Sequence, residues 1–181
     1  MIFSETKLKG AYTIEPEPFT DERGLFARVF CEKEFKAIGH EKPFVQINHS
    51  VNYKKATFRG LHYQTPPFSE IKLIRCVAGK AYDIIVDIRK GSKTFLQYFG
   101  LELSAKNMKM IYVPEGFAHG FITMEDDTQL IYHHTSFYKP GYEAGLRYDD
   151  PKLKIKLAVE PQTITEKDKS YSLINSSFTG I

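Results

Sequence analysis

The sequence predicts an all-β domain, built as a sandwich or a barrel, and three observations support this prediction. Short apolar or alternating segments recur roughly every 8–12 residues, with turn residues between them. Phe and Tyr, which fit strands better than helices, supply 14 and 11 of the 181 residues. No internal repeat, low-complexity tract or linker divides the chain, so we expect one domain over residues 1–181.

The expected strands follow apolar runs or alternating patterns, and they cover residues 11–16, 25–30, 44–51, 57–64, 71–77, 81–88, 94–103, 108–114, 120–123 and 128–134. The segment 78–80 (Ala-Gly-Lys) predicts a hairpin turn, and the segment 124–127 predicts a turn. The best helical stretch is Glu32–Ile38, which Gly39 would end. The tail after about residue 173 has few periodic signals, and we expect it to be poorly ordered.

Charge, targeting signals and cysteines point to an ordinary cytoplasmic protein. The 25 Lys+Arg and 22 Asp+Glu residues are interspersed and leave a net charge of +3, too weak to indicate a nucleic-acid or membrane partner. The first residues lack the apolar region of a signal peptide, and no uncharged apolar run approaches the roughly 18 residues of a membrane span. Cys31 and Cys76 are too few for a disulfide framework and are interpreted as buried free thiols in strands.

The densest polar cluster is Arg59-Gly-Leu-His62-Tyr-Gln64, within one expected strand. Histidine ionises nearest neutral pH, so His62 is a candidate general base. The alternative is a surface strand whose polar residues face solvent, which is the commoner case for a lone histidine. Strict alternation would put Arg59 and His62 on opposite faces. A bulge at Gly60 would therefore be needed to direct both inward.

Two further clusters carry polar groups. Pro114–Phe121 predicts a tight turn that carries His119, either at the rim of a ligand-binding barrel or at the solvated end of a plain hairpin. In the strand 128–134, Tyr132 and His134 share one face and His133 lies on the other. Adjacent histidines suggest a metal, but neighbours in a regular strand cannot both ligate it. The Tyr132 hydroxyl could equally be a hydrogen-bonded core group.

Two charged residues complete the candidates. Lys72 alternates with hydrophobic residues in a strand, so it either points into a barrel as a cation that needs an anion or points outward as a solvated lysine. The pattern alone favours the outward orientation. Asp168 lies in a charge-rich turn, and such turns usually face solvent.

Taken together, the segments resemble the RmlC family, the dTDP-4-dehydrorhamnose 3,5-epimerases, over roughly residues 7–173. The resemblance rests on eight segments in the family's order: Phe19-Thr-Asp-Glu-Arg23-Gly-Leu-Phe26, Gln46-Ile-Asn48-His-Ser50, Arg59-Gly-Leu-His62-Tyr-Gln64, Lys72-Leu-Ile-Arg75, Val86-Asp-Ile-Arg-Lys90, Val113-Pro-Glu-Gly-Phe-Ala-His119-Gly-Phe121, Tyr148-Asp-Asp-Pro151 and Thr165-Glu-Lys-Asp168. It implies a cupin-type, double-stranded β-helix jelly-roll barrel with a few short helices, and a homodimer whose N-terminal strands reach the partner.

The resemblance also implies roles for residues. His62 matches the base, Asp168 its dyad partner, Tyr132 the acid on the other face of the sugar, and Lys72 the cation beside the C4 oxygen. Nucleotide diphosphate and sugar would be held by residues that match Arg23, Phe26, Gln46, Asn48, Arg59, His119, Glu143 and Lys167, with the Tyr138 ring stacked on the base. The implied substrate is dTDP-4-dehydro-6-deoxy-D-glucose, inverted at C3 and C5, with no cofactor and no metal.

The chain departs from the family's usual pattern at three places: Arg28 where many members carry glutamate, His133 where lysine is common, and Leu157-Ala158 where Trp-Pro is usual. The alternatives are therefore an epimerase acting at one carbon only, or a ketoisomerase, on a dTDP- or CDP-linked sugar. A cupin that binds sugar nucleotides without turnover is a third hypothesis.

Overall fold

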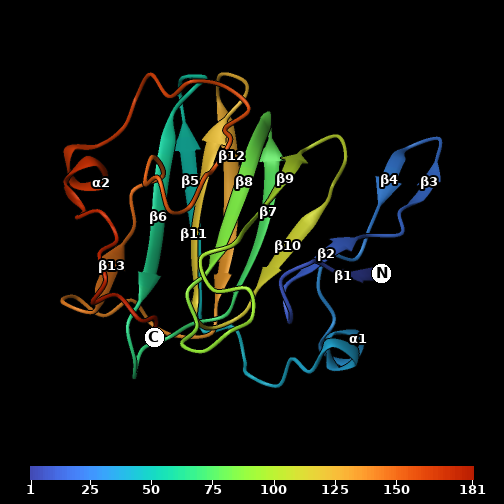
Figure 1. Cartoon of the computed structure of the whole chain (residues 1–181). Helices are drawn as coiled ribbons and strands as arrows, with labels where there is room; N and C mark the ends of the chain where they lie inside the picture. Colours follow the sequence, from blue (N-terminus) through green and yellow to red (C-terminus); the bar gives the residue numbers. More distant parts are fainter.

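The computed structural model describes residues 1–181 and consists of two antiparallel β-sheets packed face to face (Figure 1). The six-stranded sheet runs in the order β1 (Ile2–Glu5), β2 (Tyr12–Glu15), β10 (Met110–Val113), β7 (Lys72–Ala78), β12 (Thr128–His134) and β5 (Gln46–Asn52). The five-stranded sheet runs in the order β13 (Glu143–Gly145), β6 (Phe58–Gln64), β11 (Phe117–Thr123), β8 (Lys80–Asp87) and β9 (Tyr98–Ser104). The all-β, cupin-like jelly-roll prediction is confirmed.

A separate hairpin and short helical segments lie outside the two sheets. The hairpin consists of β3 (Phe19–Asp21) and β4 (Gly24–Phe26), and it projects from the body of the molecule (Figure 1). The helical segments are α1 (Glu32–Phe35), the 3-10 turn η1 (Lys36–Ile38) and α2 (Glu166–Ser170). Gly39 ends η1, and with it the continuous α1–η1 segment, with a φ of 75°, as the sequence predicted. Neither helix has the length and apolar character needed to cross a membrane.

Several elements differ from the sequence prediction. The four-residue strand β1, the three-residue strand β13 and helix α2 were not predicted, because such short elements give almost no periodic signal. The expected strand 25–30 is reduced to the end of the β3–β4 hairpin. Strand β11 begins at Phe117 rather than at residue 120, so His119 lies inside a strand and not on a turn.

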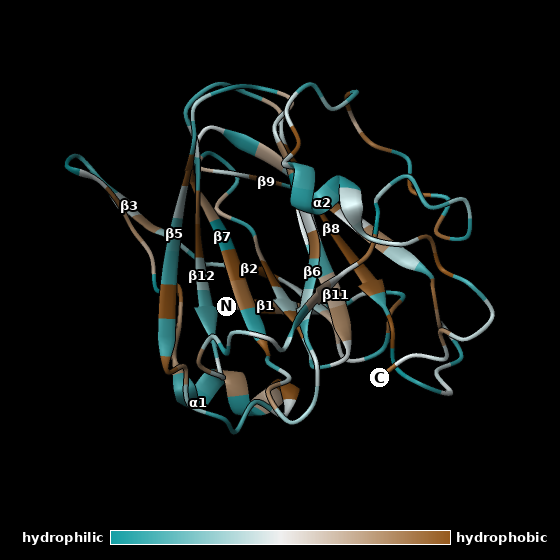
Figure 2. Cartoon of the chain, turned by 90° about the vertical axis from the view of Figure 1, so that its left-hand side faces the viewer, coloured by the Kyte–Doolittle hydropathy of each residue, from teal (hydrophilic) through white to brown (hydrophobic).

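The core between the sheets is built by alternating side chains. On β8, Ile85 faces the six-stranded sheet, while its neighbours Ile84 and Val86 pack on the outer face of the five-stranded sheet. Figure 2 shows the two sheets as opposite walls, with β5, β12 and β7 on one side and β6, β11 and β8 on the other. Both walls are covered on their outer faces as well, because α1 packs on one and the C-terminal segments on the other.

The tail that the sequence left without a pattern packs against the five-stranded sheet. Ile174 is buried in the outer cluster, and Phe178 packs against the same cluster. The backbone N–H of Ile181 donates to Ile88, and the Ile181 carbonyl accepts from Lys90. These contacts help to cover the outer face of the five-stranded sheet.

The two cysteines differ from each other. Cys76 is buried in β7, and burial raises the pKa of its thiol to about 11. Cys31 is not a buried strand residue, which corrects the prediction: it is half-buried and precedes α1, where it occupies the N-cap position. Both thiols are free.

Asp87, at the end of β8, is expected to be a major source of stability. Burial opposes its charge, but hydrogen bonds from Arg89, Ser92 and Thr94 outweigh burial and lower its pKa from 3.8 to about 2. We expect Asp87→Asn to lower the free energy of unfolding at pH 7 by about 2 kcal/mol. A depressed carboxylate pKa stabilises the fold above pH 3.8, and this contribution disappears as pH falls toward 2. Urea unfolding should therefore show a difference from wild type about 1 kcal/mol smaller at pH 3; a pH-independent difference would contradict this assignment.

Candidate active site

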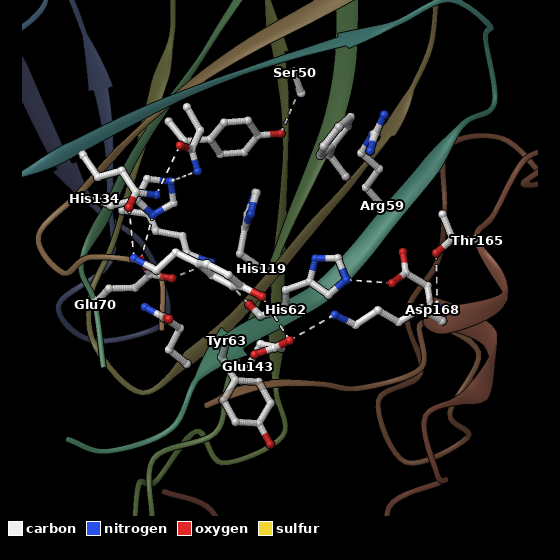
Figure 3. Close-up of a pocket in the computed structure, with 18 of the residues that line it drawn as sticks. Ser50, Arg59, His62, Tyr63, Glu70, His119, His134, Glu143, Thr165 and Asp168 are labelled. Carbon is white, nitrogen blue, oxygen red and sulfur yellow. Dashed lines mark hydrogen bonds and ion pairs between the residues drawn. The ribbon is translucent and has the colours of Figure 1, made fainter. Parts of the chain in front are cut away.

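One cavity of about 460 Å³ opens between the two sheets. Its size suits a small-molecule ligand. All of the predicted site residues line it except Arg23 and Phe26. The lining side chains come from both sheets and from α2, so residues far apart in the sequence meet in one hollow (Figure 3).

A β-bulge in β6 directs Arg59 and His62 into the cavity together. His62 pairs with His119 and Arg59 with Phe121, so β6 spans three residues where β11 spans two. Gly60 makes this possible, because it has a φ of 122° and a Cβ there would lie 2.6 Å from the Cα of Gly120. The bulge that the sequence required is therefore present.

His62 and Asp168 form a hydrogen-bonded pair at the mouth of the cavity (Figure 3). The His62 Nε2 lies 2.7 Å from the Asp168 Oδ1, and the other carboxylate oxygen accepts from the Gly60 N–H at 3.1 Å. Burial opposes the charge on Asp168, but these hydrogen bonds outweigh it and lower its pKa. The ionised carboxylate holds the proton of His62 on Nε2, which leaves Nδ1 as the nitrogen able to take a proton.

The opposite wall supplies a phenol. Tyr132 lies on β12 of the six-stranded sheet, whereas His62 lies on β6 of the other sheet. The Tyr132 hydroxyl is 3.2 Å from the Ser50 Oγ, and its ring packs against His119 at 5.9 Å between centroids. Burial raises the pKa of Tyr132, so the hydroxyl keeps its proton at neutral pH and can donate it.

Lys72 lies inside the cavity, with only 10% of its side chain exposed. Its Nζ donates to the backbone oxygen of His62 at 3.4 Å and lies 3.3 Å from the Glu70 Oε1. The sequence pattern alone favoured an outward lysine. That interpretation was wrong because both faces of β7 are covered: Ile74 packs between the sheets, and Leu73 packs on the outer cluster under α1. Lys72 shares the face of Ile74.

His119 stands behind Tyr132, deep in the cavity. Its Nε2 lies 2.8 Å from the Asp83 Oδ2, and both side chains are buried. Burial lowers the pKa of His119, so the imidazole is neutral at neutral pH. Across the whole chain, no group of three or more His, Cys, Asp or Glu side chains is arranged to hold a metal ion.

Polar groups surround the opening of the cavity. The Tyr138 N–H donates to the Gln46 Oε1, and the Tyr138 hydroxyl donates to Glu143. Glu143 also lies 3.7 Å from the ammonium of Lys167. Amide, carboxylate and ammonium groups therefore line the route by which a polar ligand would enter.

Arg23 and Phe26 lie elsewhere, on the projecting β3–β4 hairpin. Phe26 is 79% exposed, and the Arg23 side chain is 84% exposed and contacts only Asp21 of the same hairpin. The hairpin extends away from the two sheets (Figure 1), and none of its residues lines the cavity.

Sequence reasoning missed several residues that line the cavity: Ser50, Glu70, His134, Thr165 and Tyr171. Two of them had a usable signal. His134 shares a strand face with Tyr132, and Glu70 precedes Lys72 by two residues. The fold brings these residues together, because His134 on β12 is the cross-strand partner of Lys72 on β7.

Comparison with known proteins agrees with this geometry. The sequence model of dTDP-4-dehydrorhamnose 3,5-epimerase matches residues 5–176. A dTDP-4-dehydrorhamnose 3,5-epimerase of Shigella flexneri is 41% identical over 165 residues, covering 91% of each chain. The Bacillus anthracis enzyme of that name, solved with TDP and PPi bound, superimposes with a TM-score of 0.92 at 37% identity, covering 96% of this chain and 99% of that one.

A second solved structure comes from Legionella pneumophila and holds dTDP-4-keto-L-rhamnose. It superimposes with a TM-score of 0.90 at 36% identity, covering 95% of this chain and 92% of that one. The fold, the cavity and sequence similarity over nearly the whole chain lead to one conclusion: the chain is an isomerase that belongs to the dTDP-4-dehydrorhamnose 3,5-epimerase family.

Proposed function

We propose that the enzyme converts dTDP-4-dehydro-6-deoxy-D-glucose to dTDP-4-dehydro-L-rhamnose by inverting C3 and C5. The observation that carries the proposal is the placement of His62 and Tyr132 on opposite sheets of one cavity that also contains the Lys72 ammonium. A base and an acid on opposite faces of a sugar ring are what inversion of a carbon centre requires.

The chemistry follows from the ketone at C4. The protons on C3 and C5 are acidic because loss of either gives an enolate whose charge rests on the C4 oxygen. His62 takes the proton through Nδ1, and Asp168 stabilises the imidazolium that forms. The Lys72 ammonium stabilises the charge that develops on oxygen. Tyr132 then donates a proton to the other face. Exchange with water removes the proton from His62 and returns one to Tyr132, and the same steps then take place at the second carbon.

The remaining lining residues suit a nucleotide diphosphate. Arg59 is anchored through its Nε to the Asn52 Oδ1 at 2.7 Å, which leaves its terminal nitrogens available for phosphate oxygens. Lys167 adds a second cation at the opening, and the half-exposed Tyr138 ring offers a surface on which a base can stack. The reaction is redox-neutral, and the proposal includes no cofactor.

We further propose a homodimer in which the β3–β4 hairpin reaches the cavity of the partner. Phe19, Leu25 and Phe26 are all exposed on this hairpin, although apolar residues of this size favour burial. In such a dimer Arg23 and Phe26 would complete the partner's site. Arg28 follows the hairpin and pairs with Glu34 at 2.7 Å. The two free thiols suit a reducing cytoplasm, where we place the enzyme.

The function is tested by incubating the enzyme with dTDP-4-dehydro-6-deoxy-D-glucose in heavy water and following the reaction by proton NMR. We expect deuterium at both C3 and C5 and conversion to the L-rhamno product. Deuterium at one carbon only would identify a single-site epimerase. Faster turnover of the CDP-linked sugar would overturn the choice of nucleotide, and binding without any exchange would overturn the enzymatic assignment.

A further inference from the structure

A continuous chain of hydrogen bonds connects the opening of the cavity with the Lys72 ammonium. The Tyr138 N–H donates to Gln46, the Gln46 amide donates to Asn48, and the Asn48 amide lies 3.3 Å from the His134 Nε2. The His134 Nδ1 lies 2.7 Å from the Glu70 Oε2, and the Glu70 Oε1 lies 3.3 Å from the Lys72 Nζ. Figure 3 shows Glu70 and His134 together on the wall opposite Asp168.

The direction of this chain is fixed from its first donor. A backbone N–H can only donate, so Gln46 must present its oxygen to Tyr138 and its NH₂ to Asn48. Asn48 then accepts through its oxygen, which leaves its NH₂ to face His134. The His134 Nε2 must therefore accept, so this imidazole is neutral and carries its proton on Nδ1.

The other end of the chain is fixed as well. The Lys72 ammonium has only donors, and it contacts Oε1 of Glu70, whereas His134 contacts Oε2. Two donors thus converge on one carboxylate, whose side chain is only 9% exposed. Burial opposes charge on Glu70, but the His134 hydrogen bond and the Lys72 ammonium outweigh it and lower its pKa. The carboxylate is therefore ionised and accepts from both neighbours.

We propose that Glu70 and His134 are positioning residues that hold the Gln46 and Asn48 amides in one orientation and fix the Lys72 ammonium, so that the substrate-binding amides and the oxyanion-stabilising cation are set by one hydrogen-bond chain. The inference rests on the proposed function, which gives the amides and Lys72 their roles. Glu70 and His134 thus act through Lys72, Asn48 and Gln46, and neither of them takes the role of base or acid.

A glutamine at position 70 would break the chain although it has the same shape. Its oxygen can serve Lys72 or His134, but its NH₂ must face the other, which also donates. If the NH₂ faces His134, the imidazole must move its proton to Nε2, and that proton then faces the NH₂ of Asn48. Rotating the Asn48 and Gln46 amides by half a turn would remove this clash, but the NH₂ of Gln46 would then face the N–H of Tyr138, which is also a donor. Without the carboxylate, no arrangement of the hydrogen-bond chain gives every donor an acceptor.

The first experiment compares Glu70→Gln with wild type and with Glu102→Gln, a surface control whose carboxylate pairs with Lys80; neither residue lines the cavity. We expect Glu70→Gln to raise KM and lower kcat, with kcat/KM reduced roughly 10–100-fold, and Glu102→Gln to match wild type. Combining Glu70→Gln with His134→Asn should cost no more than the worse single change, because both break one chain. A kcat/KM for Glu70→Gln within twofold of wild type would overturn the proposal.

The second experiment requires no variant and no substrate. Long-range ¹H–¹⁵N spectra of histidine side chains in the wild-type protein at pH 8 distinguish the two neutral tautomers from imidazolium. We expect His134 as the neutral ring with its proton on Nδ1. A proton on Nε2, or on both nitrogens, would contradict the proposed direction of the hydrogen-bond chain. Wild-type protein that shows the expected tautomer but no solvent exchange would overturn the proposed function and leave the hydrogen-bond chain standing.

Discussion

Replacing His62 with Asn is expected to reduce epimerisation roughly 1,000-fold and to abolish deuterium uptake at both C3 and C5. Asn is shorter than His and places its amide nitrogen near the position of Nδ1, so the buried Asp168 carboxylate loses the Nε2 donor at 2.7 Å but keeps the Gly60 N–H. What is lost is the only group in the His62–Asp168 pair that can accept a proton from carbon. Proton NMR of the sugar in heavy water measures both the exchange and the turnover.

His133→Asn is the matched control for this change. His133 neighbours Tyr132 on β12, but its Nδ1 lies 3.4 Å from the Leu73 carbonyl and it does not line the cavity. The variant should exchange and invert at the wild-type rate. Deuterium uptake by His62→Asn at a rate near wild type would remove His62 from the role of base, provided that the variant still binds dTDP.

Replacing Lys72 with Met is expected to lower kcat by roughly 100- to 1,000-fold with a smaller change in KM. The two side chains have similar length, and Lys72 is only 10% exposed, so Met can fill the same space. The substitution removes the positive charge at the moment when charge grows on the C4 oxygen, which affects the transition state more than the ground state. Steady-state kinetics with the 4-keto sugar check the split between kcat and KM.

Two results would argue against this role of Lys72. A kcat for Lys72→Met within threefold of wild type would show that the ammonium does not stabilise the enolate. An effect confined to KM would make Lys72 a binding residue only. Glu70 loses one of its two donors in this variant, so the thermal midpoint of unfolding should be measured as a control for folding. We expect it to lie within a few degrees of the wild-type value.

The sequence predicted the fold class and most of the strands because period-two alternation and turn residues are local signals. It also predicted that a bulge at Gly60 was required, since Arg59 and His62 could not otherwise share a face; the observed register confirms this. The orientation of Lys72 could not be predicted, because β7 is covered on both faces and alternation does not say which face borders the cavity.

Long-range geometry accounts for the rest of what was missed. The pairing of His134 with Glu70 depends on the register of β12 against β7, which no local pattern encodes. The resemblance placed Arg23 and Phe26 in the substrate site, and in the single chain they lie on a hairpin outside the cavity. Their role depends on a second copy of the chain and stays a prediction, as do the catalytic roles of the cavity residues.

Inversion requires an acid and a base that act on opposite faces of one sugar, and Tyr132→Phe in heavy water tests this requirement most directly. The variant keeps His62 and Lys72, so the enolate should still form and the substrate should exchange its protons for deuterium within roughly tenfold of the wild-type rate. Without the phenol, only His62 can return a proton, and it does so on the face from which it removed one. We therefore expect NMR to show deuterated substrate with little L-rhamno product. Inversion at the wild-type rate, or a loss of exchange as complete as in His62→Asn, would contradict the account.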